Sequence, residues 1–373
     1  MACPAQVSGR LNSSDCHVAA LAEAVGSRSA PMTRRSEPGT QRKRSTVSND
    51  VWAGVDIGGT KTAVVISRRP PEVIFRTAFP TLPAKGPQQA IDQIMSALNR
   101  ALAEVKASKK SLRGIGVSCG GPLDPHMGVI QAPPNLPTWV DVPIVDILKK
   151  EFGCPVFLEN DANAGAIAEH RYGAGKGTRN MIFLTMGTGL GAGIIIEKKL
   201  YSGSSDMAGE IGHVRLTRTG PVGYNKTGSV EGWASGAGLA QIAEKMVQIA
   251  RKSGRKSLLL DLPKGRNVTA KDVGQAAARG DTLARAIVKA CGKKLGLALA
   301  ILVDVLNPDR IVIGGLAMRL GDMLLEPARQ SMLQEALAPA LAVCTVAPAM
   351  LGESIGDVAA LCIAMDAGGR TCI

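Results

Sequence analysis

The sequence predicts an α/β protein built from two related halves, because a glycine turn between apolar runs occurs twice. The first turn, at residues 58–61, lies between the apolar runs of residues 51–67. The second, at residues 187–189, lies between the apolar runs of residues 183–196. Aliphatic and β-branched residues on both sides of a short turn favour an antiparallel hairpin. Segments with helical spacing alternate with short apolar segments along the rest of the chain, so each half is expected to carry crossover helices.

The glycine turns do not match a dinucleotide-binding motif, which requires G-x-G-x-x-G between a strand and a helix. Residues 187–193 have glycine at every second position and lead into three isoleucines, which favour a strand. Glycine leaves backbone N–H groups accessible to a ligand. Either turn alone could be an ordinary tight turn. The pair, with Asp56 entering the first and Thr188 inside the second, indicates a phosphate-binding site.

Composition predicts a soluble, cytoplasmic protein with aliphatic cores. The 373 residues suffice for two domains, and they are 45% hydrophobic but only 3% aromatic. No apolar run approaches the roughly 18 residues that span a bilayer. The longest candidate, residues 295–306, contains Asp304. We therefore expect no membrane partner.

The net charge of +13 is typical of proteins that bind nucleic acid, but the distribution of the charges argues against such a partner. Basic residues are interspersed with acidic ones, and the aromatic residues that stack on bases are scarce. An anionic substrate such as ATP is a sufficient use for positive potential. No nucleic-acid partner is expected.

The cysteines show no C-x-x-C pair and mostly lie in apolar runs, which indicates reduced, buried thiols rather than disulfides or a zinc site. They are Cys3, Cys16, Cys119, Cys154, Cys291, Cys344, Cys362 and Cys372.

Residues 1–49 differ from the rest in being rich in Ser, Arg, Ala and Pro without periodicity. This composition predicts a disordered tail. There are two alternatives. The segment could be an organellar transit peptide, or the start codon could have been placed too early, with Met32 as the true start. The segment lacks the apolar core of a secretory signal and is too short for a helix-turn-helix domain.

Periodicity and capping residues locate the main elements. Gly153 should end a helix at residues 142–153, and Asn307-Pro308 a long helix at 281–307. Either Asn160 or Asp161 should cap the helix 161–173. Further helices are expected at 87–105, 269–280 and 356–368, strands at 113–124, 155–160 and 310–315, and a loop region at 201–232. The last helix is expected to pack against the first half.

Three polar segments carry candidate chemistry. Asp161 follows a strand and opens a helix, a position that directs a side chain into a cleft, although a plain helix cap is the alternative. Glu210 and His213 stand between glycines, and Glu231 precedes Trp233. Carboxylates, an amide and an imidazole suit the recognition of several sugar hydroxyls.

The motifs VDIGGTK, PLDPHMGVIQAPPNLPTW, ENDANAGAIAE, MGTGLGAGIII, AGEIGH, GSVEGWASG and IVIGG occur in that order. The sequence thereby resembles the ROK family of bacterial sugar kinases, which includes glucokinases and repressors, over residues 51–368. The resemblance implies the actin-like ATPase fold, with two ribonuclease-H-like α/β domains around a cleft. Residues 51–160 with 356–370 would form the smaller domain, and residues 161–355 the larger one.

The resemblance also implies roles for individual residues. Asp161 matches the catalytic base, and Asp56 would face Mg²⁺. The sugar-binding positions match Asn135, Asn160, Glu210, His213 and Glu231. The two phosphate hairpins match Gly58, Gly59, Thr60 and Lys61, and Gly187, Thr188 and Gly189. The adenosine-binding turn matches Gly314 and Gly315.

One departure from the family concerns zinc. Its members commonly carry three cysteines that bind a structural Zn²⁺ together with the histidine, whereas this chain has Val222, Tyr224 and Ser229 there. Without thiolates we expect no zinc site. The loop 220–232 must then be ordered in another way.

The resemblance implies an ATP-dependent hexose kinase acting on the 6-hydroxyl of glucose, and a homodimer. N-acetylmannosamine, N-acetylglucosamine or fructose is the near alternative as substrate, and polyphosphate as donor stays open. A sugar-responsive regulator without kinase activity, or a sugar-binding protein without turnover, is the alternative of another class.

Overall fold

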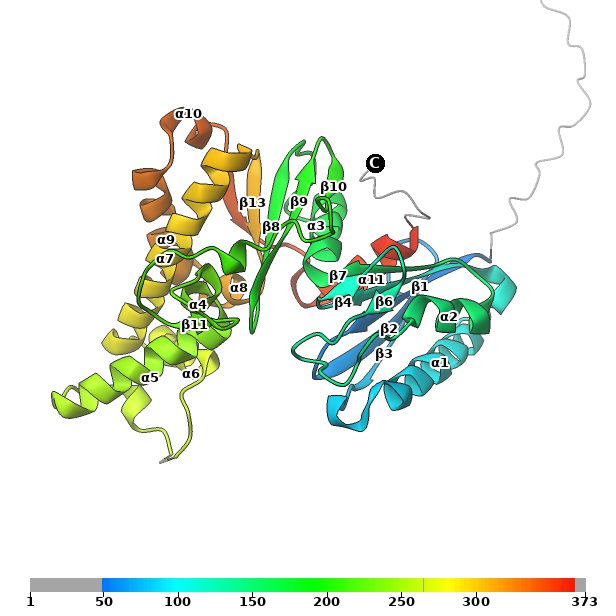
Figure 1. Cartoon of the computed structure of the whole chain (residues 1–373), viewed down its shortest axis with the longest axis horizontal. Coiled ribbons are helices and arrows are strands. Elements are labelled where there is room, and N and C mark those ends of the chain that lie inside the picture. Colours follow the sequence, from blue (N-terminus) through cyan, green and yellow to red (C-terminus); the bar gives the residue numbers. More distant parts are fainter. Residues whose placement is uncertain (1–48, 264, 366–373) are drawn as a thin grey trace, which may run out of the picture. The chain divides into compact units, whose positions relative to one another are not determined.

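Two five-stranded mixed sheets form the framework of the computed structural model, which describes residues 49–263 and 265–365 (Figure 1). The first sheet consists of β1 (Val51–Ile57), β2 (Lys61–Ser67), β3 (Phe75–Pro80), β4 (Leu112–Cys119) and β7 (Val156–Asn160). The second consists of β8 (Met181–Met186), β9 (Leu190–Ile196), β10 (Lys199–Tyr201), β13 (Arg310–Ile313) and β14 (Thr345–Pro348). The strand orders are β3-β2-β1-β4-β7 and β10-β9-β8-β13-β14.

The two sheets share one topology. In each, three successive strands form an antiparallel meander, and two later strands add in parallel beside the first strand of the meander. The predicted hairpins are therefore confirmed as β1–β2 and β8–β9, and each occupies the same place in its sheet. The repetition confirms the expectation of two related halves.

The first glycine turn is fastened by a residue after β3, which the sequence analysis did not single out. The Thr81 hydroxyl donates to the Gly58 carbonyl at 2.6 Å, and the Thr81 N–H donates to the Thr60 carbonyl at 3.1 Å. The buried Thr62 hydroxyl lies 2.9 Å from that of Thr81. These contacts fix the turn between β1 and β2.

Three helices flank the first sheet: α1 (Pro87–Glu104), α2 (Ile144–Phe152) and α11 (Ile355–Met365). The side chains of α1 and α2 that face the sheet are buried apolar ones, as the periodicity predicts. Helix α11 packs on β1 and β4, although it follows the last strand of the second sheet (Figure 1). The prediction that the last helix returns to the first half is confirmed.

The second sheet packs against α3 (Asp161–Tyr172) and a larger set of helices. These are α4 (Val230–Ala234), α5 (Gly236–Lys252), α6 (Ala270–Ala278), α7 (Thr282–Leu306), α8 (Leu316–Leu320), α9 (Asp322–Glu335) and α10 (Ala338–Leu341). Helices α7 and α9 lie side by side (Figure 1). Aliphatic side chains of the sheet and of these helices form one core.

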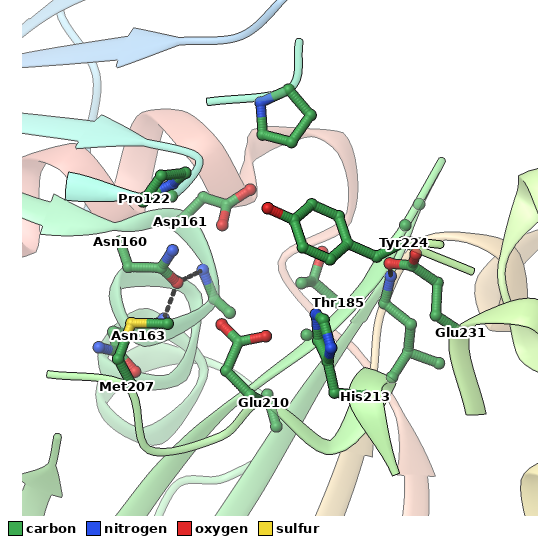
Figure 2. Close-up of a pocket in the computed structure, with 18 of the residues that line it drawn as sticks. Pro122, Asn160, Asp161, Asn163, Thr185, Met207, Glu210, His213, Tyr224 and Glu231 are labelled. Atoms are coloured by element: carbon green, nitrogen blue, oxygen red, sulfur yellow. Dashed lines mark hydrogen bonds between the residues drawn. The ribbon is translucent and has the colours of Figure 1, made fainter. Parts of the chain in front are cut away.

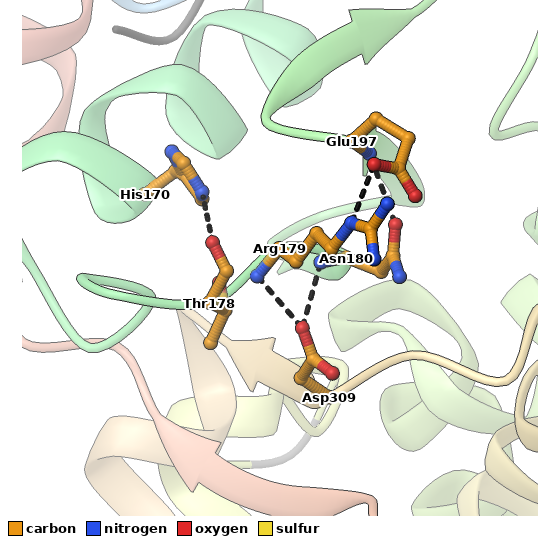
Figure 3. Close-up of polar contacts among 6 residues, drawn as sticks. All are labelled: His170, Thr178, Arg179, Asn180, Glu197 and Asp309. Atoms are coloured by element: carbon orange, nitrogen blue, oxygen red, sulfur yellow. Dashed lines mark hydrogen bonds and ion pairs between the residues drawn. The ribbon is translucent and has the colours of Figure 1, made fainter.

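Polar contacts join the strand ends of the second sheet (Figure 3). The Asp309 carboxylate accepts from the N–H groups of Arg179 at 2.7 Å and Asn180 at 2.8 Å, just before β8. The Arg179 side chain pairs with Glu197 at 2.5 Å, in the turn between β9 and β10. These contacts align β8 with both of its neighbours.

Capping resolves several predicted boundaries. Asn160 is the N-cap of α3, since its side chain accepts from the N–H groups of Ala162 at 2.9 Å and Asn163 at 3.4 Å. Gly153 ends α2 with φ of 67°, and Asn307 ends α7 with φ of 43°, both left-handed conformations.

Further predictions have mixed outcomes. The five cysteines of the described residues are buried thiols outside any disulfide, as expected, and the other three lie outside the described residues. No helix within the described residues is both long and apolar enough to cross a membrane. The predictions for residues 1–49 concern a segment that, apart from Asn49, the structure does not describe. The domain boundaries stay a prediction.

Candidate active site

A cavity of about 430 Å³ lies where the N-terminus of α3, the β8–β9 turn and several loops meet. All the predicted catalytic and sugar-binding residues line it together (Figure 2). Predicted residues on its wall are Asn135, Asn160, Asp161, Gly187, Thr188, Gly189, Glu210, His213 and Glu231. Predicted residues outside the wall are Asp56, Gly58, Gly59, Thr60, Lys61, Gly314 and Gly315.

Asp161 is placed by the junction of β7 and α3. Its carboxylate belongs to the first turn of α3, whose N-cap is Asn160, and it points into the cavity (Figure 2). Solvent reaches the side chain through the cavity, while protein surrounds it elsewhere. This surrounding protein raises the pKa of the Asp161 carboxyl, and the N–H groups of Ala162 and Asp161 itself oppose the rise.

Asp56 ends β1 and lies close to two other carboxylates. Burial first, and then the charges of Asp161 and Asp357, raise the pKa of Asp56 to about 6, against a Ser118 hydrogen bond and the charge of Lys61. The Asp56 carboxylate also lies against Gly356 in the first turn of α11, where any Cβ would collide with it. Asp56 is thus a carboxylate whose charge the protein only partly compensates.

The Asp56 carboxylate fits a position beside Mg²⁺ that is held jointly with phosphate oxygens. Mg²⁺ is commonly bound through one or two carboxylates together with phosphate oxygens and waters. Within the described residues no group of three or more His, Cys, Asp and Glu side chains could hold a metal ion alone. A cation beside Asp56 would offset the repulsion that raises its pKa.

Glu210, His213 and Glu231 form one polar wall of the cavity (Figure 2). Burial raises the pKa of the Glu210 carboxyl; the charges of Glu231 and Asp161 add to the rise, and that of His213 opposes it. Glu231, in the first turn of α4, accepts the Leu190 N–H at 3.0 Å.

The second glycine turn is built against this wall. A Cβ at Gly189 would lie 2.7 Å from Oε2 of Glu231, so a side chain there would displace the Glu231 carboxylate. The Gly187 carbonyl accepts the Gly236 N–H at 2.8 Å, and the Thr188 carbonyl accepts the Ala237 N–H at 3.2 Å. The start of α5 therefore holds the turn, and the turn meets the polar wall directly.

The remaining predicted positions surround the cavity. Gly59 of the first turn lies against Asn135, which does line the cavity. Lys61 is exposed, and its charge acts on Asp56. Gly315 begins α8 with φ of 64° and lies against Met186, at the end of β8. Both glycine turns and Gly315 therefore border the same region, from different strands.

The loop that lacks the family's cysteines is ordered by hydrogen bonds. A small hairpin joins β11 (Val222–Gly223) and β12 (Lys226–Thr227). The Gln241 amide accepts the Val222 N–H at 2.9 Å and donates to its carbonyl at 2.8 Å. The indole N–H of Trp233 donates to the Thr217 hydroxyl at 2.7 Å. The Lys226 ammonium donates to the His213 carbonyl at 2.8 Å.

The cavity wall also includes residues that the sequence does not single out, among them Asn163, Asp206, Met207 and Tyr224. Asn163 stands three residues after Asn160, one helical turn along α3, so helical spacing could have identified it. Asp206, Met207 and Tyr224 come from irregular loops, where no periodicity identifies a direction.

Comparison with known proteins places the chain in a family. Residues 52–367 match the model of the ROK family. A glucokinase of Halalkalibacterium halodurans is 38% identical over 76% of this chain and 85% of its own length. A xylose repressor of Caldicellulosiruptor bescii is 29% identical over 76% of this chain and 71% of its own.

A solved structure supports the same assignment. A ROK family glucokinase from Streptomyces griseus, in complex with glucose and AMPPNP, is 30% identical and superposes with a TM-score of 0.71. The match covers 84% of this chain and 99% of that one. Together with the repeated sheet topology, it confirms the predicted α/β fold of the actin-like ATPase type. The chain belongs to the ROK family.

Proposed function

We propose that the protein is an ATP-dependent glucose kinase that transfers the γ-phosphoryl group of Mg-ATP to the 6-hydroxyl of the sugar. The observation that carries the proposal is the position of Asp161, whose carboxylate points into a cavity bordered by a glycine turn and a polar wall (Figure 2). The 38% identity to a glucokinase, and the likeness to a glucokinase structure with glucose and AMPPNP, support both substrates.

In this proposal Asp161 acts as the general base. A carboxylate within hydrogen-bond reach of the sugar hydroxyl accepts its proton as the oxygen attacks phosphorus. The raised pKa of the Asp161 carboxyl makes its carboxylate a stronger base than an ordinary aspartate. The helix cap by Asn160 fixes the backbone of Asp161 and so the direction of its side chain.

The polar wall would select and orient the sugar. Glu210, Glu231 and His213 contribute acceptors and an imidazole to the lining of the cavity, and Asn135 and Asn160 contribute amides. Groups built to pair with hydroxyls discriminate strongly against ligands that lack them. Orientation of the reacting hydroxyl is the main contribution that a protein makes to phosphoryl transfer.

The glycine turns would bind the phosphates. The N–H groups of Gly58 and Gly187 close their own turns by donating to the carbonyls of Lys61 and Gly189. Those of residues 59–60 and 188–189 would be available to phosphate oxygens, beside glycines that add no side chain, and the Lys61 ammonium would neutralise part of the phosphate charge. Gly314 and Gly315 would accommodate the adenosine. Bound Mg²⁺, which Asp56 would hold directly or through water, supplies charge neutralisation at the transferring phosphate.

Further parts of the proposal rest on the sequence. The family resemblance supports a homodimer, the composition supports a cytoplasmic location without a nucleic-acid partner, and the missing cysteines argue against zinc. The 29% identity to a xylose repressor keeps a regulator without turnover as the second candidate.

The experiment is ADP release by the purified full chain with Mg-ATP, tested with glucose, mannose, fructose, allose, N-acetylglucosamine and N-acetylmannosamine. The proposal expects the highest kcat/KM with glucose. A strong signal with another sugar alone would replace the substrate but keep the reaction. Folded protein that binds a sugar without releasing ADP would favour the regulator.

A further inference from the structure

Tyr224 is a cavity-lining residue to which the proposed mechanism assigns no role. It occupies the turn of the β11–β12 hairpin with φ of 42°, and Asn225 follows with φ of 62°. Asn adopts the left-handed conformation readily, but a bulky aromatic residue seldom does. Strained backbone of this kind concentrates at functional sites, where the surrounding structure maintains it.

The surroundings of Tyr224 fix its ring beside the sugar-binding wall. The ring meets that of His213 edge-on, with centroids 4.8 Å apart and planes at 69°. This is a favoured arrangement of two aromatic rings. Gln241 holds one strand of the hairpin, and Lys226 ties the other strand to the His213 carbonyl. The Tyr224 ring is therefore positioned relative to His213 from both strands.

The exposure and direction of the side chain indicate a ligand contact. Tyr224 is 56% exposed, yet it lines the cavity, and its hydroxyl points across the cavity toward Asp161 (Figure 2). No residue that the structure describes forms a hydrogen bond with that hydroxyl. The phenol is thus available to a molecule in the cavity.

The chemistry of the wall gives this hydroxyl a specific task. Ionised Asp161, Glu210 and Glu231 only accept hydrogen bonds, whereas a phenol can also donate. A sugar hydroxyl that donates to a carboxylate still has lone pairs that require a donor. The ring lines the cavity beside His213, so it limits the space that is left there for a substituent of a bound sugar.

We infer that Tyr224 selects the sugar: its hydroxyl donates to a hydroxyl of the bound hexose, and its ring excludes N-acylated hexosamines. The inference rests on the proposed sugar-kinase function and adds a specificity residue to it. Discrimination would combine a hydrogen bond to the unsubstituted hexose with a steric clash against the N-acylated sugar.

The test compares Tyr224→Phe and Tyr224→Ala with the wild-type full chain. Tyr224→Phe should raise KM for glucose about fivefold to tenfold, the effect of one hydrogen bond, and leave KM for ATP within about twofold. Tyr224→Ala should raise the ratio of kcat/KM for N-acetylglucosamine or N-acetylmannosamine to that for glucose by at least about tenfold.

Tyr201 provides the matched control, since it is a tyrosine of similar exposure, at 50%, outside the cavity wall. Tyr201→Phe should leave the KM for glucose unchanged, and Tyr201→Ala should leave the ratio of kcat/KM values unchanged. Unchanged glucose KM in Tyr224→Phe, together with an unchanged sugar ratio in Tyr224→Ala, would overturn the inference. A Tyr224→Ala protein that does not fold leaves Tyr224→Phe as the deciding variant.

Calorimetric titration of each sugar separates this inference from the proposed function. If the wild-type chain binds glucose but does not phosphorylate it, the kinase proposal fails, and Tyr224 is judged from the affinities of the same variants. A weaker glucose affinity in Tyr224→Phe alone would then uphold the selection role. A wild-type chain that binds none of the sugars would overturn both.

Discussion

At the scale of single residues, the carboxylates around the cavity are placed at a cost to stability. Burial and the charges of Asp161 and Asp357 oppose the ionisation of Asp56. Asp357 itself is paired with the Arg76 guanidinium at 2.6 Å. Perturbed carboxylates that converge on one cavity are typical of functional sites. Their repulsion is the feature that bound cation and substrate would relieve.

The substitution Asp56→Asn tests this cost. In the folded state the pKa of Asp56 is about 6, against 3.8 for an unperturbed aspartate. Stability from this group therefore falls as pH rises between these values, because the folded state binds more protons than the unfolded chain there. We expect Asp56→Asn to have the higher melting temperature at pH 7.5, and the gain to shrink toward pH 4.5.

Melting curves between pH 4.5 and 8 measure this difference. Asp261→Asn, at an exposed position, serves as the control and should show no pH-dependent gain. A melting temperature of Asp56→Asn that stays below the wild-type value at pH 7.5 would mean that the Asp56 carboxylate stabilises the fold. The variant should also lose activity if Asp56 holds Mg²⁺.

The sequence could identify Asp161, Glu210, His213 and Glu231, because each stands in a motif with its own local context. It could not identify Tyr224 or Asp206 as cavity residues. Their directions depend on loops that are set by distant partners, such as Gln241 for the β11–β12 hairpin. Pairings of this kind are properties of the tertiary structure and leave no periodic pattern.

At the scale of elements, one buried carboxylate joins the end of α3 to the segment that leads into α11. Glu169 is fully buried and accepts the N–H groups of Ala174 at 2.7 Å, Met350 at 3.0 Å and Leu351 at 2.8 Å. A carboxylate is suited to this position because all its partners are donors.

We expect Glu169→Gln to destabilise the protein by roughly 2–3 kcal/mol, since an amide nitrogen would face N–H donors in a buried site. Chemical denaturation measures the change. Glu244→Gln on the exposed face of α5 is the control and should stay within about 0.5 kcal/mol of wild type. Equal stabilities of Glu169→Gln and wild type would show that these hydrogen bonds contribute little.

The loop 220–232 leads to a prediction about metal removal. Hydrogen bonds of Gln241, Trp233 and Ser229 order it, so zinc should be unnecessary. Elemental analysis should find less than about 0.1 zinc per chain, and dialysis against a chelator followed by Mg²⁺ should leave melting temperature and activity unchanged. One zinc per chain, with unfolding on its removal, would contradict this account of the loop.

Most helices could be predicted because they carry caps and a regular apolar stripe, as α2 and α7 do. The structure adds β3, α9 and β14, which the sequence analysis did not propose. Strand β3 has no fully buried residue, β14 has four residues, and α9 contains Pro327. Edge strands and an interrupted helix are defined by their neighbours, and local pattern is weak there.

At the scale of the whole described chain, two helices connect the sheets near the candidate catalytic residues. Helix α3 follows β7 of the first sheet and packs on β8 and β9 of the second. Helix α11 follows β14 of the second sheet and packs on β1 and β4 of the first. The two helices also contact each other. Asp161 opens α3, and Gly356 in the first turn of α11 touches Asp56.

This arrangement links catalysis to the relative position of the two sheets. Because α3 and α11 join the two sheets, a rotation of one sheet against the other would act on these two helices, which begin beside Asp161 and Asp56. Closure on sugar and nucleotide would exclude water that competes as acceptor.

The most direct test of the central claim is the rate of glucose 6-phosphate formation by Asp161→Asn relative to wild type, with glucose affinity measured in parallel. The account predicts a wild-type enzyme that forms glucose 6-phosphate and ADP in equal amounts. It predicts that Asp161→Asn binds glucose with similar affinity but turns over about 10²–10⁴ times more slowly. Near-normal turnover of Asp161→Asn would contradict the account, because another group would then have to accept the proton.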